Sequence, residues 1–217
     1  MLLLIKQKSR KMKHLVIYAH PNQSSLNGQL KNTLIPHLLD QREEVELRDL
    51  YQLNFNPVLS LKDVEGQRMG NVADDVKREQ EFIRWADCLT FIHPIWWTGL
   101  PAIMKGYIDR VFSYGFAYQY QQGVQQGLLA GKQAVIVNTH GKSKAEYAET
   151  GMDRALLLTS DTGIYAYCGL EIKKHLFFDN ADTTTAKIIE KTEIKETFNK
   201  IEVDRFASND FQNIDKV

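Results

Sequence analysis

Two adjacent tryptophans, Trp96 and Trp97, lie in a short segment that offers a flat aromatic surface for stacking. A buried strand is expected over Cys88–His93, where it breaks at Pro94, and a helix is expected over Leu100–Phe112. Adjacent tryptophans in a short loop cannot both point into the core, so we expect one of them to face a flat, apolar ligand. The alternative is that both cap the sheet as packing residues.

A second candidate site follows the apolar run His14–Ala19, which is predicted as a buried strand. The next segment is polar and begins a helix over Leu26–Leu39. Free N–H groups at such a helix start, together with Ser and Asn side chains, suit a phosphate, although neither a GxGxxG motif nor a Walker lysine loop is present. The alternative is that Ser24, Ser25 or Asn27 only caps the helix.

A third candidate site is the end of the apolar run Gln133–Asn138, which continues as Asn138, Thr139, His140 and Gly141. Small and polar residues let the backbone approach a ligand edge and donate hydrogen bonds. An ordinary turn from strand to loop is the alternative.

The elements that position these sites alternate between strand and helix, which predicts an α/β fold. We expect a doubly wound parallel sheet of five strands in the order 2-1-3-4-5, with helices on both faces in three layers. The remaining expected elements are the strands Glu44–Leu50 and Glu171–Phe178, the helices Val72–Ala86, Met152–Tyr167 and Thr183–Phe206, and the irregular segments Tyr51–Gly70 and Thr139–Gly151. In this order the loops after the first, third and fourth strands share one crevice, and their residues together suit a flavin.

Length and composition limit the function classes. The 217 residues indicate one domain, predicted over 13–206, with an N-terminal extension over 1–12 and a polar tail over 207–217; the start is either Met1 or Met12. Lys and Arg number 27, as do Asp and Glu, which argues against nucleic-acid binding or a membrane-surface role driven by bulk charge. No segment reaches a membrane-spanning length, and a cytoplasmic protein is expected.

Other chemistries find little support in the sequence. Cys88 and Cys168 are interpreted as reduced packing residues, because no CxxC pair or disulfide framework is present. The six histidines form no HExxH motif or Cys/His cluster, so no metal site is expected. The absence of a GxSxG motif disfavours a hydrolase of that type.

Three segments carry a family resemblance: Ala19-His20-Pro with Ser24-Ser25-Leu26-Asn27, the run from His93 to Phe112, and Gly115-Phe-Ala-Tyr-Gln-Tyr. They resemble the NAD(P)H:quinone oxidoreductase family, which has the flavodoxin-like fold. The resemblance implies a cofactor site in which the flavin phosphate and ribityl chain meet His20, Ser24, Leu26 and Asn27. It implies an isoalloxazine wall of Pro94, Ile95, Trp97 and Thr98, beside Trp96, and a rim of Asn138, Thr139, His140 and Gly141.

The same resemblance implies the activity. We expect a flavin-dependent NAD(P)H oxidoreductase that reduces quinones, or related azo or nitro acceptors, by two electrons in ping-pong hydride transfer. Trp97 is the expected stacking wall, the N–H groups of Ile95–Thr98 are expected to bond the flavin N5 and O4 region, and Tyr147 is the expected proton donor to the acceptor. The cofactor is FMN or FAD, with FMN favoured because the long C-terminal extension of larger members is missing, and the donor is NADH or NADPH.

Partners and departures follow from the resemblance as well. It implies a homodimer in which Tyr118 and Tyr120 reach the partner's site. Alternatives are an ancillary regulatory flavoprotein of a potassium-efflux transporter, which would be a membrane partner, and a flavodoxin-type electron carrier. The family histidine that follows the active-site tyrosine has no clear counterpart here, and Asp153 lies near its position.

Overall fold

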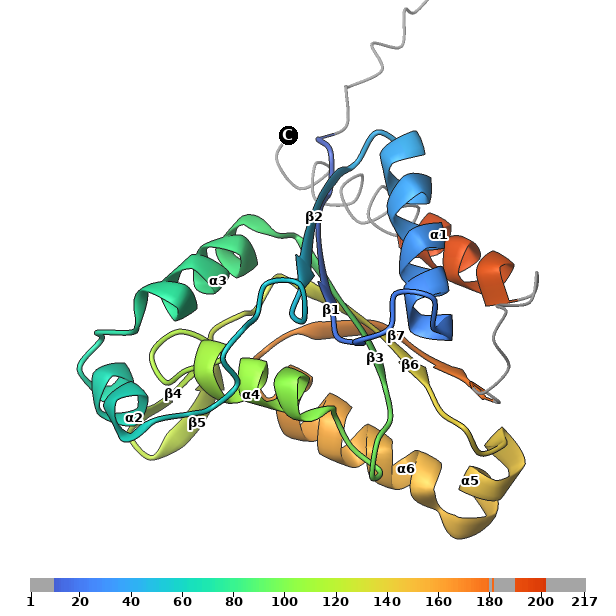
Figure 1. Cartoon of the computed structure of the whole chain (residues 1–217). Coiled ribbons are helices and arrows are strands. Elements are labelled where there is room, and N and C mark those ends of the chain that lie inside the picture. The colour runs from blue at the N-terminus through green and yellow to red at the C-terminus, as the bar shows by residue number, and fades with distance from the viewer. Residues whose placement is uncertain (1–9, 180, 182–189, 202–217) are drawn as a thin grey trace, which may run out of the picture.

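A central sheet of five parallel strands organises the computed structural model, which describes residues 10–179, 181 and 190–201 (Figure 1). The strand order is β2-β1-β3-β6-β7, and β4 and β5 form a separate antiparallel hairpin. The strands are β1 (Lys13–Tyr18), β2 (Glu44–Asp49), β3 (Cys88–Pro94), β4 (Tyr118–Gln121), β5 (Val124–Gly127), β6 (Gln133–Thr139) and β7 (Glu171–Phe178). Without the hairpin, this order is the predicted 2-1-3-4-5, so the predicted fold class is confirmed.

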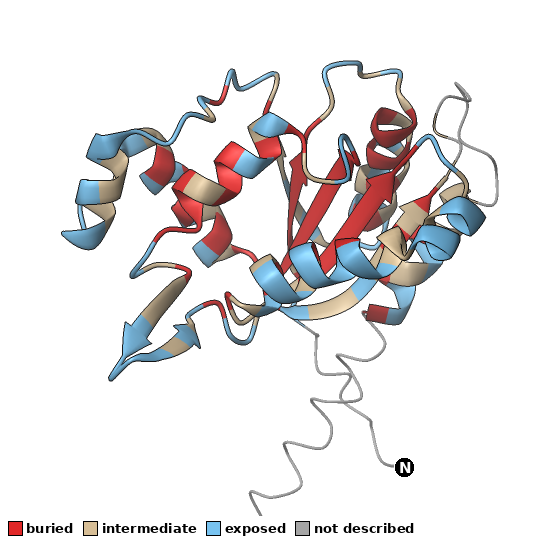
Figure 2. Cartoon of the chain, turned by 90° about the horizontal axis from the view of Figure 1, so that it is seen from below, coloured by how far each residue is buried: buried red, intermediate tan, exposed pale blue. Residues whose placement is uncertain are grey.

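Helices cover both faces of the sheet and give the predicted three layers (Figure 1). The helices are α1 (Leu26–Asp40), α2 (Leu61–Arg68), α3 (Asp74–Trp85), α4 (Ala102–Val111), α5 (Lys144–Thr150), α6 (Met152–Leu156) and the π-helix η1 (Leu157–Ala166). Apolar side chains of α1 and of the helical residues 190–201 pack against one face, whereas those of α3, α4 and η1 pack against the other. The middle strands are buried on both faces, as Figure 2 shows, which explains their continuous apolar runs.

Two segments that were predicted to be irregular each contain a helix. The stretch Tyr51–Gly70 includes α2, and Thr139–Gly151 includes α5. Each helix begins with a capping box, Ser60 with Asp63 and Ser143 with Glu146, in which the serine side chain accepts from the third backbone N–H and the acid accepts from the serine N–H. A Ser followed three residues later by an acid is a readable helix-start signal, so the prediction missed local information that was present.

The predicted regular helix over Met152–Tyr167 is also corrected. Only α6 is α-helical, and the π-helix η1 follows it directly. The Thr159 and Ser160 hydroxyls bond back to carbonyls one turn earlier, at 3.0 Å to Ala155 and 2.8 Å to Leu156. Such side-chain bonds compete with the regular backbone ladder and disfavour an ordinary α-helix.

Other predicted segments are accounted for as follows. Residues 190–201 of the predicted final helix are helical, and the rest of Thr183–Phe206, the tail 207–217 and residues 1–9 of the extension lie outside the described residues. Cys88 and Cys168 are free and buried, in agreement with packing roles. Within the described residues, no helix has both the length and the apolar character needed to cross a membrane.

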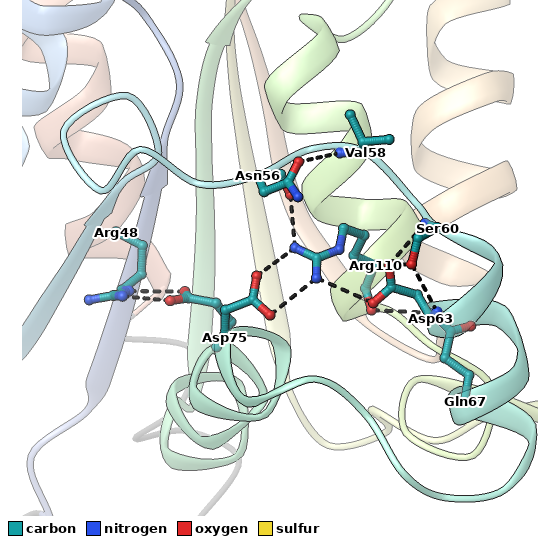
Figure 3. A network of polar contacts seen from close by, with 9 residues as sticks. Arg48, Asn56, Val58, Ser60, Asp63, Gln67, Asp75 and Arg110 are labelled. Carbon is teal, nitrogen blue, oxygen red and sulfur yellow. Dashed lines mark hydrogen bonds and ion pairs between the residues drawn. The ribbon is translucent and has the colours of Figure 1, made fainter.

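A buried arginine on α4 joins this helix to α2, to α3 and to the segment that precedes α2 (Figure 3). Arg110 is 4% exposed and donates to the Asn56 carbonyl at 2.8 Å, to both carboxylate oxygens of Asp75 at 2.6 and 3.1 Å, and to Asp63 at 3.3 Å. The same helix meets the irregular segment through Gly106, where a Cβ would lie 2.1 Å from the Pro57 carbonyl oxygen. These contacts fix α2 and α3 against α4.

Candidate cofactor site

The three predicted loops meet at the carboxyl ends of β1, β3 and β6, where two cavities adjoin. The smaller has a volume of about 200 Å³ and lies at the start of α1. The larger has a volume of about 1030 Å³ and lies between the tryptophan loop and α5. Ile95 and Gly141 line both cavities, so the two spaces lie side by side.

The start of α1 forms the closed end of the smaller cavity. Ser25 is the N-cap, and its hydroxyl accepts from the Gly28 N–H at 3.2 Å. Gly28 is required here because a Cβ would lie 2.0 Å from the Gln23 carbonyl oxygen. Ser25 and not the predicted Ser24 lines the cavity, since Ser24 is exposed. Of the three capping residues left open by the sequence, Ser25 is the one used.

The His20 ring lies beside this helix start. Its Nδ1 lies 3.0 Å from the Asn22 backbone nitrogen and 3.1 Å from the Asn22 carbonyl oxygen. Burial lowers the pKa of His20 and favours the neutral ring. The His20 ring lies 5.7 Å from the ring of Trp96, which also lines the smaller cavity.

Asn27 provides the clearest test of whether a cofactor fits. Its side chain is buried, and its Nδ2 donates to the Thr139 hydroxyl at 2.7 Å. Its Oδ1 is also buried and has no hydrogen-bond partner among the described residues. A buried unpaired acceptor is destabilising, by about 1–3 kcal/mol. A hydroxyl of a ribityl chain would satisfy it, and a phosphate would meet the free N–H groups of the helix start.

The tryptophan loop holds its backbone in a sparsely populated conformation. Trp97 and Thr98 have φ values of 50° and 56°, which are unusual for residues with a Cβ. A pair of 3.1 Å hydrogen bonds between Trp96 and Gly99 closes the turn. Backbone strain of this kind persists where the surrounding structure fixes it, and it is common in ligand-binding loops.

Only part of the predicted backbone donor set is available to a ligand. The Ile95 N–H donates to the Thr139 carbonyl at 2.8 Å, and the Trp96 N–H donates to Gly99. The N–H groups of Trp97 and Thr98 have no acceptor in the described part of the chain. The N–H groups of Ile95–Thr98 were expected to bond the flavin, and those of Ile95 and Trp96 are instead used within the chain.

The two tryptophans point to different parts of the site, and neither is buried. Trp96 is 40% exposed and lines the smaller cavity, whereas Trp97 is 100% exposed and lines the larger one. The alternative in which both cap the sheet as packing residues is therefore wrong. Pro94 lines the smaller cavity, and Thr98 lines the larger one.

Tyr147 stands on α5 across the larger cavity from the tryptophan loop. Its ring stacks on His140, with centroids 4.5 Å apart and an interplanar angle of 10°. Burial raises the pKa of Tyr147 and lowers that of His140, so the phenol is protonated and the imidazole neutral. The His140 Nδ1–H donates to the Lys142 carbonyl at 2.6 Å, which fixes the ring.

The rim differs from the prediction in one residue. Thr139, His140 and Gly141 line the smaller cavity, but Asn138 does not, because its side chain turns inward to His93 and His175. The prediction also missed wall residues of the larger cavity, namely Lys142, Glu146, Glu149, Thr150 and Met152. The capping box at Ser143 would have placed several of them on one helix.

No group of three His, Cys, Asp or Glu side chains within the described residues is placed to bind a metal ion.

Comparisons with known proteins agree with this geometry. A family described by its flavodoxin-like fold matches residues 12–201. An NAD(P)H oxidoreductase of Haemophilus influenzae, named as uncharacterized, is 40% identical over 170 residues, which cover 77% of this chain and 84% of that protein. The ribosyldihydronicotinamide dehydrogenase [quinone] of Homo sapiens is 33% identical over 180 residues, which cover 74% of this chain and 78% of that protein.

A solved structure is similar as well. The NAD(P)H:quinone oxidoreductase from Methanothermobacter marburgensis superposes with a TM-score of 0.76 at 26% sequence identity, covering 86% of this chain and 97% of that one. The family match spans most of the chain, and the relatives are matched along most of their own length. The chain therefore belongs to the flavodoxin-like family and, within it, to the NAD(P)H:quinone oxidoreductases.

Proposed function

We propose that the chain binds one flavin, with FMN favoured over FAD, and uses NADH or NADPH to reduce a quinone, azo or nitro acceptor by two electrons. The observation that carries this proposal is that two unlike cavities adjoin and share Ile95 and Gly141 in their walls. The smaller one has phosphate and hydroxyl partners, and the larger one has flat aromatic walls and a protonated phenol. One ligand that extends from a phosphate to a ring system would fill both.

The protein's part in the reaction is to hold and expose the ring system. The α1 start, the His20 ring and the Asn27 Oδ1 would hold the phosphate and ribityl chain. The free N–H groups of Trp97 and Thr98 would donate to the ring edge. A flavin bound there would accept two electrons from the reduced nicotinamide and pass them to the acceptor in a second half-reaction.

The larger cavity is proposed to receive the nicotinamide and the acceptor in turn. Trp97 would stack against either flat molecule, because its side chain is fully exposed at the cavity wall. The Tyr147 hydroxyl would donate a proton to an acceptor oxygen as that oxygen gains negative charge. Reduction of a quinone to a hydroquinone consumes two electrons and two protons, of which the reduced nicotinamide supplies both electrons and one proton.

The test is turnover of NADH or NADPH with menadione by the purified protein after loading with FMN. The proposal predicts acceptor-dependent oxidation of the nicotinamide, with Trp97→Ala impaired and the surface variant Lys174→Gln unimpaired. Lys174 is exposed on β7 and lines neither cavity, so it is a suitable control. A flavin-loaded protein that does not oxidise the nicotinamide in the presence of the quinone favours the electron-carrier or transporter-subunit alternative.

A further inference from the structure

Four polar side chains form a continuous hydrogen-bonded chain beneath the candidate cofactor site, and the proposed reaction does not use them directly. Asp161 Oδ1 lies 2.8 Å from His175 Nδ1, and His175 Nε2 lies 2.8 Å from Asn138 Oδ1. Asn138 Nδ2 lies 3.2 Å from the backbone oxygen of His93 and 3.3 and 3.2 Å from its ring nitrogens Nδ1 and Nε2. The chain connects η1, β7, β6 and β3, and below we refer to these four residues as the relay.

The direction of these hydrogen bonds follows from one fixed acceptor. Asn138 Nδ2 also lies 3.2 Å from the backbone oxygen of His93, which can only accept. The Asn138 atom on that side is therefore the amide nitrogen, and the atom facing His175 is the oxygen. His175 Nε2 must donate to that oxygen, so it carries a proton.

The other nitrogen of the same ring carries a proton as well. His175 Nδ1 faces the Asp161 carboxylate, which accepts when ionised. With Asp161 ionised, both ring nitrogens of His175 are hydrogen-bond donors, and the ring pairs with a carboxylate. The side chains are 4% and 14% exposed, so this ion pair is largely buried, and either charge alone would be strongly destabilising.

His93 continues the chain toward the site as a neutral ring. Burial is the main cause that lowers the pKa of His93 to about 4, and the nearby charge of His175 lowers it further. The His93 Nδ1–H donates to the Pro94 carbonyl oxygen at 3.0 Å, and the Asn138 amide nitrogen donates to the His93 backbone oxygen and lies within 3.3 Å of both ring nitrogens.

The relay ends on the peptide group at which the tryptophan loop begins. The Pro94 oxygen belongs to the same peptide unit as the Ile95 N–H, which donates to the Thr139 carbonyl at 2.8 Å. A hydrogen bond to one end of a peptide unit strengthens the bond made by its other end. Thr139 in turn holds Asn27 through its hydroxyl. The relay is thus connected both to the tryptophan loop and, through Thr139, to Asn27 at the start of α1, and both line the smaller cavity.

The π-helix explains how an acid from a distant segment reaches this position. Asp161 lies in the middle of η1, and π-helical turns are frequent at functional sites. The Ser160 hydroxyl lies 2.7 Å from the Asp161 carboxylate oxygen that faces His175. The π-helix η1 therefore carries Asp161, the acidic residue at one end of the relay.

We propose that Asp161 and His175 are positioning residues for the cofactor site: their buried ion pair orients Asn138 and His93, and through them the Pro94–Ile95 peptide and the loop that holds the flavin ring. The proposal rests on the proposed function in so far as the ligand is a flavin. Its residues lie outside both cavities and contact the ligand only through the loop.

The first test needs no substitution. Ring-nitrogen NMR of the unaltered protein at neutral pH should show protons on both nitrogens of His175 and on one nitrogen of His93. Saturation with FMN should shift the ring signals of His93 and His175, whereas His37 on α1, which lines neither cavity, should not respond. A His175 ring with a single proton, or relay signals that do not respond to bound FMN, would overturn the proposal.

The second test uses near-isosteric variants. Asp161→Asn and His175→Gln should each raise the FMN dissociation constant about tenfold, and the double variant should be no weaker than the single ones, because both changes break the same chain. Lys174→Gln, which removes an exposed charge next to His175, should leave FMN binding unchanged. Folded variants that bind FMN as tightly as the unaltered protein would contradict the proposal, and if a variant fails to fold, the NMR result decides.

Measurements of FMN binding distinguish the positioning role of the relay from the flavin proposal itself. If the unaltered protein does not bind FMN, the proposed function fails. If the unaltered protein binds FMN and the two relay variants bind it equally well, only the positioning role fails. The Asn27→Ala variant, which acts inside the smaller cavity, should weaken FMN binding in either case if the flavin proposal holds.

Discussion

His140 and Tyr147 lie face to face, with ring centroids 4.5 Å apart and ring planes within 10° of parallel. The Lys142 carbonyl holds His140 through its Nδ1–H, so the imidazole forms a fixed surface against which the tyrosine ring rests. Tyr147 lies on the seven-residue helix α5, which makes few other contacts with the core. The stacking with His140 therefore determines where the phenol hydroxyl lies in the larger cavity.

Tyr147→Phe should slow reduction of the acceptor by about 10²-fold and leave reduction of the flavin by the nicotinamide nearly unchanged. The substitution removes only the hydroxyl and keeps the ring that stacks on His140. Rapid-mixing kinetics can measure the two half-reactions separately. If both keep their rates, Tyr147 is not the donor, and the proton must come from water or from His140.

Trp97→Ala should reduce turnover and have little effect on folding. Because the Trp97 side chain is fully exposed, its removal should change the free energy of unfolding by no more than about 0.5 kcal/mol. The lost stacking with the acceptor corresponds to about 0.5–1.5 kcal/mol, which should appear as a raised KM. Trp96→Ala is the matched comparison and should weaken flavin binding instead. A large fall in Tm with unchanged kinetics would identify Trp97 as a structural residue.

Arg110→Met should lower the free energy of unfolding by about 3 kcal/mol, because it leaves the carboxylates of Asp63 and Asp75 without their buried partner. Lys105→Met on the same helix is the control. Lys105 and Asp109 form an exposed i,i+4 pair, whose loss should cost about 0.5 kcal/mol or less. Urea unfolding of the two variants at neutral pH measures the difference, and equal effects would contradict a structural role of the buried arginine.

The same network predicts a pH dependence. Hydrogen bonds from Arg110 hold the pKa of Asp75 below its ordinary value of 3.8. A carboxyl group with a depressed folded-state pKa stabilises the fold above its unfolded pKa, and this contribution is lost as the pH falls through the folded-state value. The stability of the unaltered protein should therefore fall below pH 3.8, and Arg110→Met should show a smaller fall. Because Asp75 is partly exposed, solvent screening makes the effect modest.

The hairpin β4–β5 is the surface on which a homodimer is predicted to form. Tyr120 and Val124 are 53% and 65% exposed on this hairpin, which is unusual for large apolar side chains unless a partner covers them. Tyr118 instead packs against Tyr167 of its own chain, with ring centroids 5.4 Å apart. Val124→Lys should shift the protein toward monomer in sedimentation experiments. A stable monomer with bound flavin and full activity before any substitution would contradict the predicted dimer.

The parts of the fold that depend on local pattern were predictable. The buried runs of β1, β3 and β6 are continuous because both sheet faces are covered, and their polar ends mark the edge where ligands bind. The helices α2 and α5 were missed although Ser60 and Ser143 begin recognisable capping boxes. In both cases the capping box is a local helix-start signal, but the surrounding residues are mostly polar and show no clear apolar period that would indicate a helix.

The relay could not be predicted from the sequence. Its hydrogen-bonded neighbours lie 14 to 45 positions apart along the chain, and no spacing rule connects them. They meet because η1 adopts π-helical geometry and because β3, β6 and β7 are neighbours in the sheet. The choice of Ser25 over Ser24 at the helix start, and the use of the Ile95 N–H within the sheet, likewise depend on the folded backbone.

The most direct test of the central claim is the absorbance spectrum of the purified protein during anaerobic addition of NADH or NADPH, followed by menadione. The account predicts a yellow protein with one flavin per chain, loss of the colour with the nicotinamide, and its return when the quinone is added. A colourless protein that neither binds nor quenches the fluorescence of FMN or FAD at micromolar concentration would contradict it.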